Sequence, residues 1–242
     1  MFSIFTKEIS AFFSTLIGYL VIGVFLVAIG LFMWVFSDTS VLSYNFATME
    51  QLFSIAPLVF LFLIPAITMR SFAEEMSSGT LELLFTKPLT INDIVLAKYL
   101  SNLTLVILAL IPTSVYYVSI YMLGSPVGNI DTGAVIGSYI GLFFLGGSFV
   151  AIGMFASALS RNQIIAFILG AFLCFFVHWA FSYIANIRTF SGGLDLFIQK
   201  LGINYHYSSI SKGLIDSKDI IYFLSVIFLF LYGTVLLLKT KR

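Results

Sequence analysis

Charge is scarce in this chain. Lysine, arginine, aspartate and glutamate together make up 10% of its 242 residues, and hydrophobic residues make up 60%. Soluble globular domains use roughly 25% charged residues, so the composition excludes that class. The formal net charge of +1 also excludes the basic surface that nucleic-acid binding needs.

Cysteine and enzyme motifs are lacking as well. The single cysteine, Cys174, lies in an apolar stretch, so the chain has no disulfide framework. None of the patterns G-x-x-x-x-G-K-[ST], H-E-x-x-H and G-x-S-x-G occurs. We therefore expect no catalytic residue, no metal site, no cofactor and no ATPase on this chain.

Long uncharged stretches are what the sequence has instead. Six of them each supply the about 20 apolar residues with which a helix crosses a bilayer core. None shows the alternation of apolar and polar residues that is typical of barrel strands. We predict an all-α membrane protein, a single domain over residues 1–242, with spans at about 14–36, 52–69, 94–123, 133–159, 163–185 and 219–238.

Residues 1–13 have a different pattern from the spans. Apolar residues such as Phe5 and Ile9 recur at helical spacing, with Lys7 and Glu8 between them. This pattern favours a short amphipathic helix lying in the membrane interface. The alternative is a frayed start of the first span.

Glycine and proline indicate the packing and shape of two expected spans. Gly133, Gly137 and Gly141 recur at a spacing of four, which predicts a face where helices pack closely. Pro57 and Pro65 predict a kink in the second span. The alternative is that they reflect only the higher frequency of proline in membrane helices.

The fifth span carries His178 beside Trp179. An ionisable residue within a span is a candidate functional residue. The alternative is that both belong to the aromatic belt at the interface. In the following segment, 186–218, apolar residues at helical spacing near 194–201 predict a short amphipathic outer helix. His206 alone does not supply enough ligands for a metal site.

Lysine and arginine set the expected orientation. The two short loops on one side of the membrane contain no lysine or arginine. The 186–218 segment on the same side contains both, but it is long, and the positive-inside rule is weak for long segments. We therefore expect both termini in the cytoplasm of a bacterium and the chain in its inner membrane. The expected cytoplasmic positive residues are Lys7, Arg70, Lys87, Lys98, Arg161, Lys239, Lys241 and Arg242.

Residues 70–93 join the second and third expected spans and belong to the densest cluster of charge in the sequence. A break at Gly79, an acidic residue early in the next turn at Glu82 and a stop at Lys87–Pro88 predict two short helices. Thr90–Asp93 resembles a capping box that starts the third span. The pattern predicts a folded cytoplasmic elbow, and a solvated loop is the alternative.

This segment also carries a family resemblance. The segment resembles the signature of ABC-2 type transporter permeases at Arg70, Glu75, Gly79, Thr80, Glu82, Leu84, Pro88 and Lys98. The six spans, the amphipathic start and the basic C-terminus resemble that family as well. The chain most resembles the permease of gliding-motility ABC transporters (GldF type), and the permease of copper-processing, nitrous-oxide-reductase maturation transporters is also similar.

The resemblance implies a permease that assembles with a second permease protomer and with a separate ATPase, which binds ATP and magnesium. It implies that residues 70–93 form the coupling helix, that 1–13 form the connecting helix, and that 186–218 form re-entrant outer helices. His178 and Trp179 are candidates for the transport path. The implied ATPase-coupling residues are Arg70, Glu74, Glu75, Gly79, Thr80, Glu82 and Pro88.

Three kinds of function remain open at this point. The first is an exporter linked to gliding motility or envelope secretion, or a permease for copper and nitrous-oxide-reductase maturation. The second is a membrane scaffold that anchors a motility or secretion complex. The third, an intramembrane enzyme or channel, is disfavoured because the spans hold almost no carboxylates or histidines.

Overall fold

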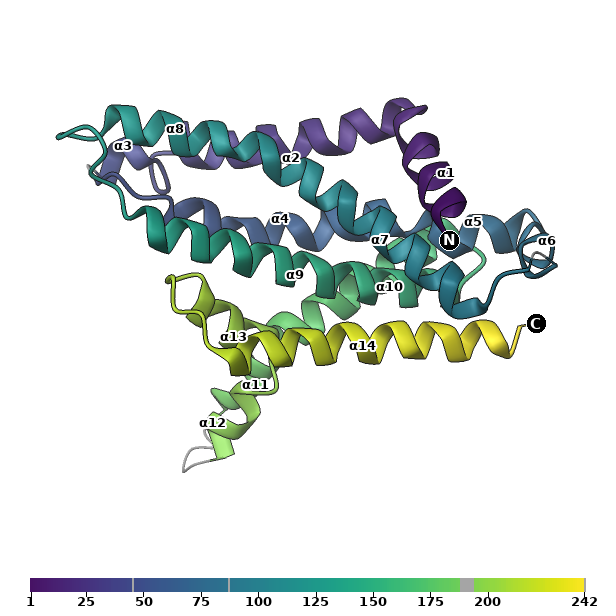
Figure 1. Ribbon diagram of the computed structural model, residues 1–242. Coiled ribbons are helices and arrows are strands. Elements are labelled where there is room, and N and C mark those ends of the chain that lie inside the picture. The colour runs from purple at the N-terminus through teal and green to yellow at the C-terminus, as the bar shows by residue number, and fades with distance from the viewer. Residues whose placement is uncertain (45, 87, 188–193, 242) are drawn as a thin grey trace.

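The computed structural model describes residues 1–242 except 45, 87, 188–193 and 242. The described residues form helices and no strands, which confirms the all-α class. Five helices are long and apolar enough to cross a membrane, and a bent pair at the N-terminus makes up to six. The long helices run side by side along one direction (Figure 1).

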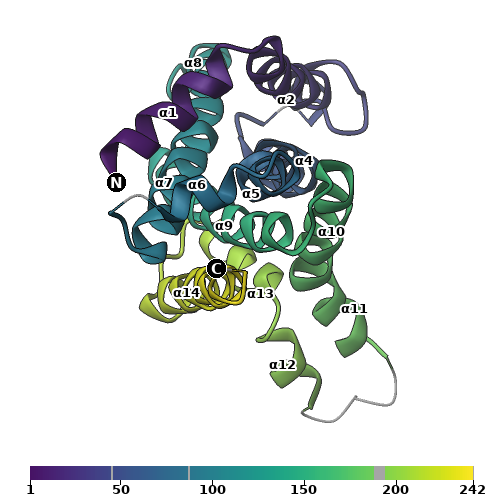
Figure 2. The ribbon, with the colours of Figure 1, turned by 90° about the vertical axis from the view of Figure 1, so that its right-hand side faces the viewer.

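The N-terminal pair consists of α1, Phe2–Phe13, and α2, Leu16–Trp34. The helix axes change direction by 69° between them. As Figure 2 shows, α1 turns away from α2 and lies across the bundle, where it packs against α7, Ile91–Leu110. Residues 1–13 therefore form a helix distinct from the first span, and its place at a membrane interface stays a prediction.

The second span is longer than the sequence indicated. After the short α3, Val41–Tyr44, helix α4 covers Glu50–Thr68 and α5 covers Arg70–Ser77. Together they form one helix of 28 residues, interrupted only at Met69. Both prolines lie inside α4 without ending it. The helix thus continues eight residues beyond the expected end of the span.

The third and fourth spans are continuous rods. Helix α7 runs through a 3-10 turn, Ile111–Thr113, into α8, Ser114–Leu123. Helix α9, Thr132–Leu159, is the most deeply buried element. Around it pack α4, α7, α10 (Gln163–Phe175) and α14 (Ser217–Lys239), as Figure 2 shows. The core of the bundle therefore follows α9.

The fifth span is irregular in a way that the sequence did not indicate. Helix α10, Gln163–Phe175, passes through a π-helical turn, Phe176–Ala180, into α11, Phe181–Ala185. Such turns are rare, and they are frequent at functional sites. This one contains His178 and Trp179.

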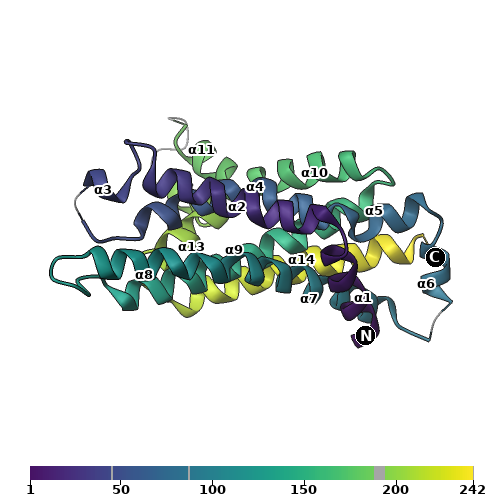
Figure 3. The ribbon, with the colours of Figure 1, turned by 90° about the horizontal axis from the view of Figure 1, so that it is seen from above.

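Two short helices precede the last span. They are α12, Leu194–Gln199, and α13, Ile203–Ile210, and α14 covers Ser217–Lys239. Residues 188–193 of the expected outer segment lie outside the described residues. The N-terminus and the end of α14 lie near α5 and α6, Leu81–Phe85, and we call this the elbow end. Helix α3 and the end of α8 lie at the opposite, distal end (Figures 1 and 3).

Candidate functional site

The elbow, residues 70–93, is a folded turn between two helices. Gly79 has φ of +69°, a left-handed backbone that L side chains rarely adopt, and nothing lies within 4 Å of where its Cβ would be. Glycine is therefore favoured here by the backbone and not by lack of space. The Ser78 hydroxyl lies 2.8 Å from the Glu74 carbonyl and 2.9 Å from the Thr80 hydroxyl, which orders the turn.

Helix α6, Leu81–Phe85, gives the elbow an inner and an outer face. Leu81 and Leu84 are buried, whereas Glu82 is exposed and Leu83 is 65% exposed. The helix ends at Phe85, two residues before the expected stop, and Lys87 lies outside the described residues. The exposed residues of the elbow are Glu74, Ser77, Ser78, Gly79, Thr80, Glu82, Leu83, Thr86, Pro88, Thr90 and Asn92.

A capping box starts α7 and closes the elbow. The Thr90 hydroxyl accepts a hydrogen bond from the Asp93 N–H at 3.1 Å. The Asp93 carboxylate accepts from the Thr90 N–H at 3.1 Å and lies 2.6 Å from the Thr90 hydroxyl. Both ends of the elbow are therefore hydrogen-bonded, so the structure has the folded elbow and not the solvated loop.

Behind the elbow lies a charge cluster of Lys7, Glu8, Glu75 and Lys98. The Lys98 ammonium donates to Glu8 Oε1 at 2.7 Å and to Glu75 Oε1 at 3.0 Å. Lys7 Nζ lies 3.7 Å from the same Glu75 oxygen. The cluster therefore joins three elements, α1 through Glu8, α5 through Glu75 and α7 through Lys98.

The burial of Lys98 makes this cluster structurally demanding. Its side chain is 2% exposed, and the Glu75 side chain is 12% exposed. A buried ammonium is costly unless it is paired and hydrogen-bonded, so Lys98 depends on its two carboxylates. The Phe72 ring, with its centroid 5.3 Å from Lys98 Nζ, adds a cation–π contact.

The two neighbouring glutamates of α5 have opposite orientations. Glu74 is exposed, and its carboxylate forms no ion pair within the described chain, whereas Glu75 points inward to Lys98. The sequence placed both at the same contact, so it did not separate their roles. It also did not indicate Glu8 as a partner, because Glu8 and Lys98 are 90 residues apart.

A cavity of about 360 Å³ lies beside the charge cluster. Arg70 lines it, and the Nε atom of Arg70 and the Oε2 atom of Glu75 are buried and have no hydrogen-bond partner among the described residues. Buried polar atoms are normally paired. Both atoms therefore retain capacity to bond a water molecule or a side chain of a partner.

Ser157 of α9 holds the interruption between α4 and α5. Its hydroxyl accepts from the N–H groups of Phe72 at 3.0 Å and Ala73 at 3.1 Å, and it donates to the Met69 carbonyl at 2.9 Å. Met69 and Ala73 would bond each other in an uninterrupted helix. The break is thus hydrogen-bonded to the central helix, which links the elbow to the core.

The C-terminal end of the chain also contacts the elbow end. Lys241 Nζ donates to the Ala158 carbonyl at 2.6 Å and lies 3.2 Å from the Met76 sulfur of α5. Burial lowers the pKa of Lys241, and the positive charge of Arg161 lowers it further. The elbow is therefore held by α1, α7, α9 and the end of α14.

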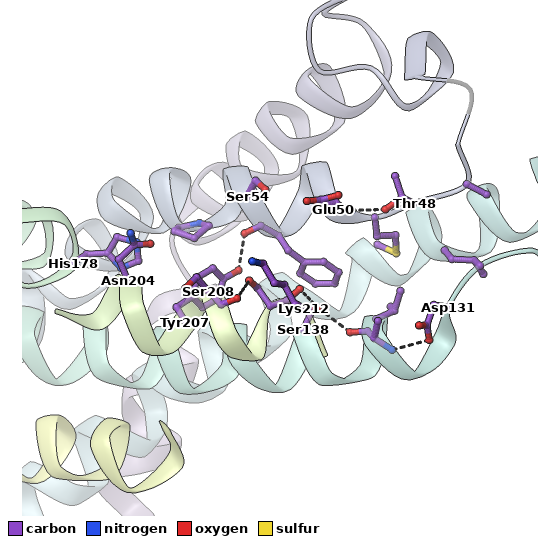
Figure 4. Close-up of a pocket in the computed structure, with 18 of the residues that line it drawn as sticks. Thr48, Glu50, Ser54, Asp131, Ser138, His178, Asn204, Tyr207, Ser208 and Lys212 are labelled. Carbon is purple, nitrogen blue, oxygen red and sulfur yellow. Dashed lines mark hydrogen bonds between the residues drawn. The ribbon is translucent and has the colours of Figure 1, made fainter. Parts of the chain in front are cut away.

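The remaining sequence candidates lie outside the elbow. His178 and Trp179 line a cavity of about 620 Å³, which we call the distal cavity (Figure 4). Its walls come from the start of α4, the start of α9, the π-helical turn and α13. No pattern in the sequence indicates this cavity, because residues from four separate segments form it.

The three glycines of α9 have different surroundings. A Cβ on Gly137 would lie 2.9 Å from the Cα of Gly213, and a Cβ on Gly141 would lie 2.9 Å from Ile210 Cγ2. Gly133 faces only the Asp131 carboxylate, at 3.4 Å. Gly137 and Gly141 therefore let the segment of α13 and its following turn approach α9 closely.

One comparison with known proteins identifies a family. A family model described as "ABC-2 family transporter protein" matches residues 35–238, which include the elbow, α9 and the distal cavity. No curated protein matched the sequence. The match begins after α2, so α1 and its contribution to the charge cluster lie outside it.

Proposed function

The chain belongs to the ABC-2 transporter family, and from that membership we propose that its elbow is the docking site of an ABC ATPase. The family makes the chain a multi-pass membrane permease subunit of an ABC transporter with an ATPase partner. The proposal assigns ATP and magnesium to that partner, and none to this chain. The observation that carries it is the folded, exposed elbow fixed to the bundle by the buried Lys98–Glu75 pair.

The outer surface of the elbow has the chemistry of a docking face. It combines an exposed apolar side chain, Leu83, with the acidic Glu74 and Glu82. An apolar anchor surrounded by polar residues is typical of a protein interface. In this proposal Arg70 and Glu75 act behind that face, and Gly79, Thr80 and Pro88 shape it.

The fold offers a direct route from the elbow to the other end of the bundle. The 28-residue helix Glu50–Ser77 is about 42 Å long at 1.5 Å per residue. Its last turns belong to the elbow, and its first residue, Glu50, lines the distal cavity. Closure of the ATPase dimer would push the elbow, and the Lys98–Glu75 pair would make α7 and α1 move with α5.

We extend the proposal to the assembly and its role. A second permease protomer would complete the membrane part, and the complex would lie in a bacterial inner membrane with both termini in the cytoplasm. The positive residues at the elbow end support this orientation, since Lys7, Arg70 and Lys98 lie together there. The resemblance of the chain to gliding-motility permeases supports an exporter linked to motility or envelope secretion.

A matched pair of substitutions tests the docking site. Leu83 at the elbow is 65% exposed, and Leu214, on the turn between α13 and α14, is 66% exposed. We expect Leu83→Asp to lower the amount of ATPase that co-purifies with the chain at least about tenfold, because a charge would replace an apolar anchor. Leu214→Asp serves as the control and should retain the ATPase. Equal retention by both variants, with both inserted in membranes, would contradict the docking site.

A further inference from the structure

The distal cavity contains a hydrogen-bonding group that the fold leaves unused. His178 is 1% exposed, and its Nδ1 atom has no hydrogen-bond partner within the described residues. The ring packs against Trp179, with centroids 4.2 Å apart, and lines the cavity. Buried polar atoms without partners are rare and destabilising, so a bound group that pairs with Nδ1 would satisfy the site.

The cavity also carries charges of both signs that the described chain does not neutralise. Glu50, Asp131 and Lys212 line it, and none of them forms an ion pair with another described residue. The Asp131 carboxylate caps α9 by accepting from the Ala134 N–H at 3.0 Å. The other two charged groups, the Glu50 carboxylate and the Lys212 ammonium, retain their full hydrogen-bonding capacity.

The positions of these groups define the ligand. Figure 4 shows Glu50, Asp131 and Lys212 at separate places around the cavity, with His178 at the end away from Asp131. A purely cationic ligand would be repelled by Lys212, and a purely anionic one would face two carboxylates. A ligand with both charges would place its cation at a carboxylate and its anion at Lys212.

We propose that the distal cavity binds a zwitterion with a primary ammonium and an anionic phosphate or carboxylate. The ammonium lies at Glu50, the anionic group at Lys212, and a hydrogen-bonding group at His178 Nδ1. This chemistry occurs in a phosphoethanolamine lipid headgroup and in small water-soluble zwitterions. The cavity volume of about 620 Å³ falls within the range of small-molecule sites. The proposal does not depend on docking of an ATPase at the elbow.

The two tryptophans of the chain provide the readout. Trp34→Phe leaves Trp179, in the cavity wall, as the single tryptophan whose fluorescence reports binding. The full chain in phosphatidylglycerol nanodiscs is titrated with glycerophosphoethanolamine, ethanolamine and glycerophosphate. We expect the zwitterion to bind at least about tenfold more tightly than either half, since each charge-assisted hydrogen bond adds affinity.

Variants locate the ligand. Lys212→Gln and Glu50→Gln should each raise the Kd for glycerophosphoethanolamine at least about tenfold. Lys218→Gln is the control, because Lys218 is an exposed lysine of the same region that does not line the cavity. Equal binding of the zwitterion and its two halves, or an unchanged Kd in both cavity variants, would overturn the proposal.

A second lipid separates the two sources of the ligand. In phosphatidylethanolamine nanodiscs, a lipid headgroup in the cavity would compete with the soluble probe and raise its apparent Kd at least about tenfold relative to phosphatidylglycerol. An equal Kd in both lipids would assign the cavity to a water-soluble zwitterion. These measurements need no ATPase, so failure of the elbow proposal would leave them unaffected.

Discussion

The pairing of Glu75 with Lys98 is the feature of the elbow that mutation tests most sharply. Glu75→Gln keeps the size of the side chain and removes its charge, which leaves Lys98 with the Glu8 carboxylate at 2.7 Å. Glu74→Gln makes the same chemical change one residue earlier, on an exposed side chain without an ion pair among the described residues. The two variants therefore differ in burial and in contact with the ammonium groups of Lys98 and Lys7.

The magnitude follows from burial. Breaking a buried ion pair by removing one partner costs about 3–5 kcal/mol. Lys98 is 2% exposed, but Glu75 is 12% exposed and Glu8 remains as a second partner. We therefore expect Glu75→Gln to lower the free energy of unfolding by about 2–3 kcal/mol. Glu74→Gln should change it by less than about 0.5 kcal/mol.

The assay is denaturant unfolding of the purified chain in detergent, followed by stimulation of the partner ATPase. Glu75→Gln should also weaken the response of the ATPase to the permease, because α5 would no longer be fixed to α1 and α7. The loss of unfolding free energy in the double variant Glu75→Gln with Lys98→Met should be smaller than the sum of the two single-variant losses by about 1 kcal/mol or more. Equal destabilisation by Glu74→Gln and Glu75→Gln would refute the reasoning.

Other sites in the structure carry matched tests. Ser157→Ala should destabilise the chain by about 1–3 kcal/mol in the unfolding assay, because it removes three hydrogen bonds at the α4–α5 break. Ser148→Ala should be near neutral in the same assay, because the buried Ser148 hydroxyl has no hydrogen-bond partner among the described residues. Gly137→Ala should cost about 1–3 kcal/mol by thermal unfolding, because its Cβ would meet backbone, and Gly133→Ala should cost little. Gly79→Ala should lower the free energy of unfolding by about 1 kcal/mol, and Gly79→Asn should lower it less, since asparagine tolerates a positive φ better. Equal losses in the two variants would exclude backbone strain as the cause.

Local signals in the sequence predicted the elbow well. Gly79 marks a turn because of its backbone freedom, and the capping box of Thr90 and Asp93 involves residues only three positions apart. The uncharged runs likewise predicted the helices, because a bilayer core requires apolar length. Each of these inferences uses neighbours in the chain.

Contacts between distant segments could not be predicted in the same way. Glu8, Glu75 and Lys98 meet only after α1 folds across α7, and no pattern in the sequence encodes that meeting. The π-helical turn around His178 and the hydrogen bonds of Ser157 also depend on packing. The position of Lys98 within an apolar run is the sequence feature that indicates a need for buried partners.

Photo-crosslinking from the elbow tests the docking of the ATPase most directly. In a Cys174→Ala background, a photoreactive group is attached at Glu82→Cys, on the exposed face of α6, or at Leu214→Cys on the turn before α14. Each protein is then illuminated in complex with the ATPase. The account requires an adduct with the ATPase from position 82 and none from position 214. An adduct from position 214 alone, or none from position 82 while the ATPase co-purifies, would contradict it.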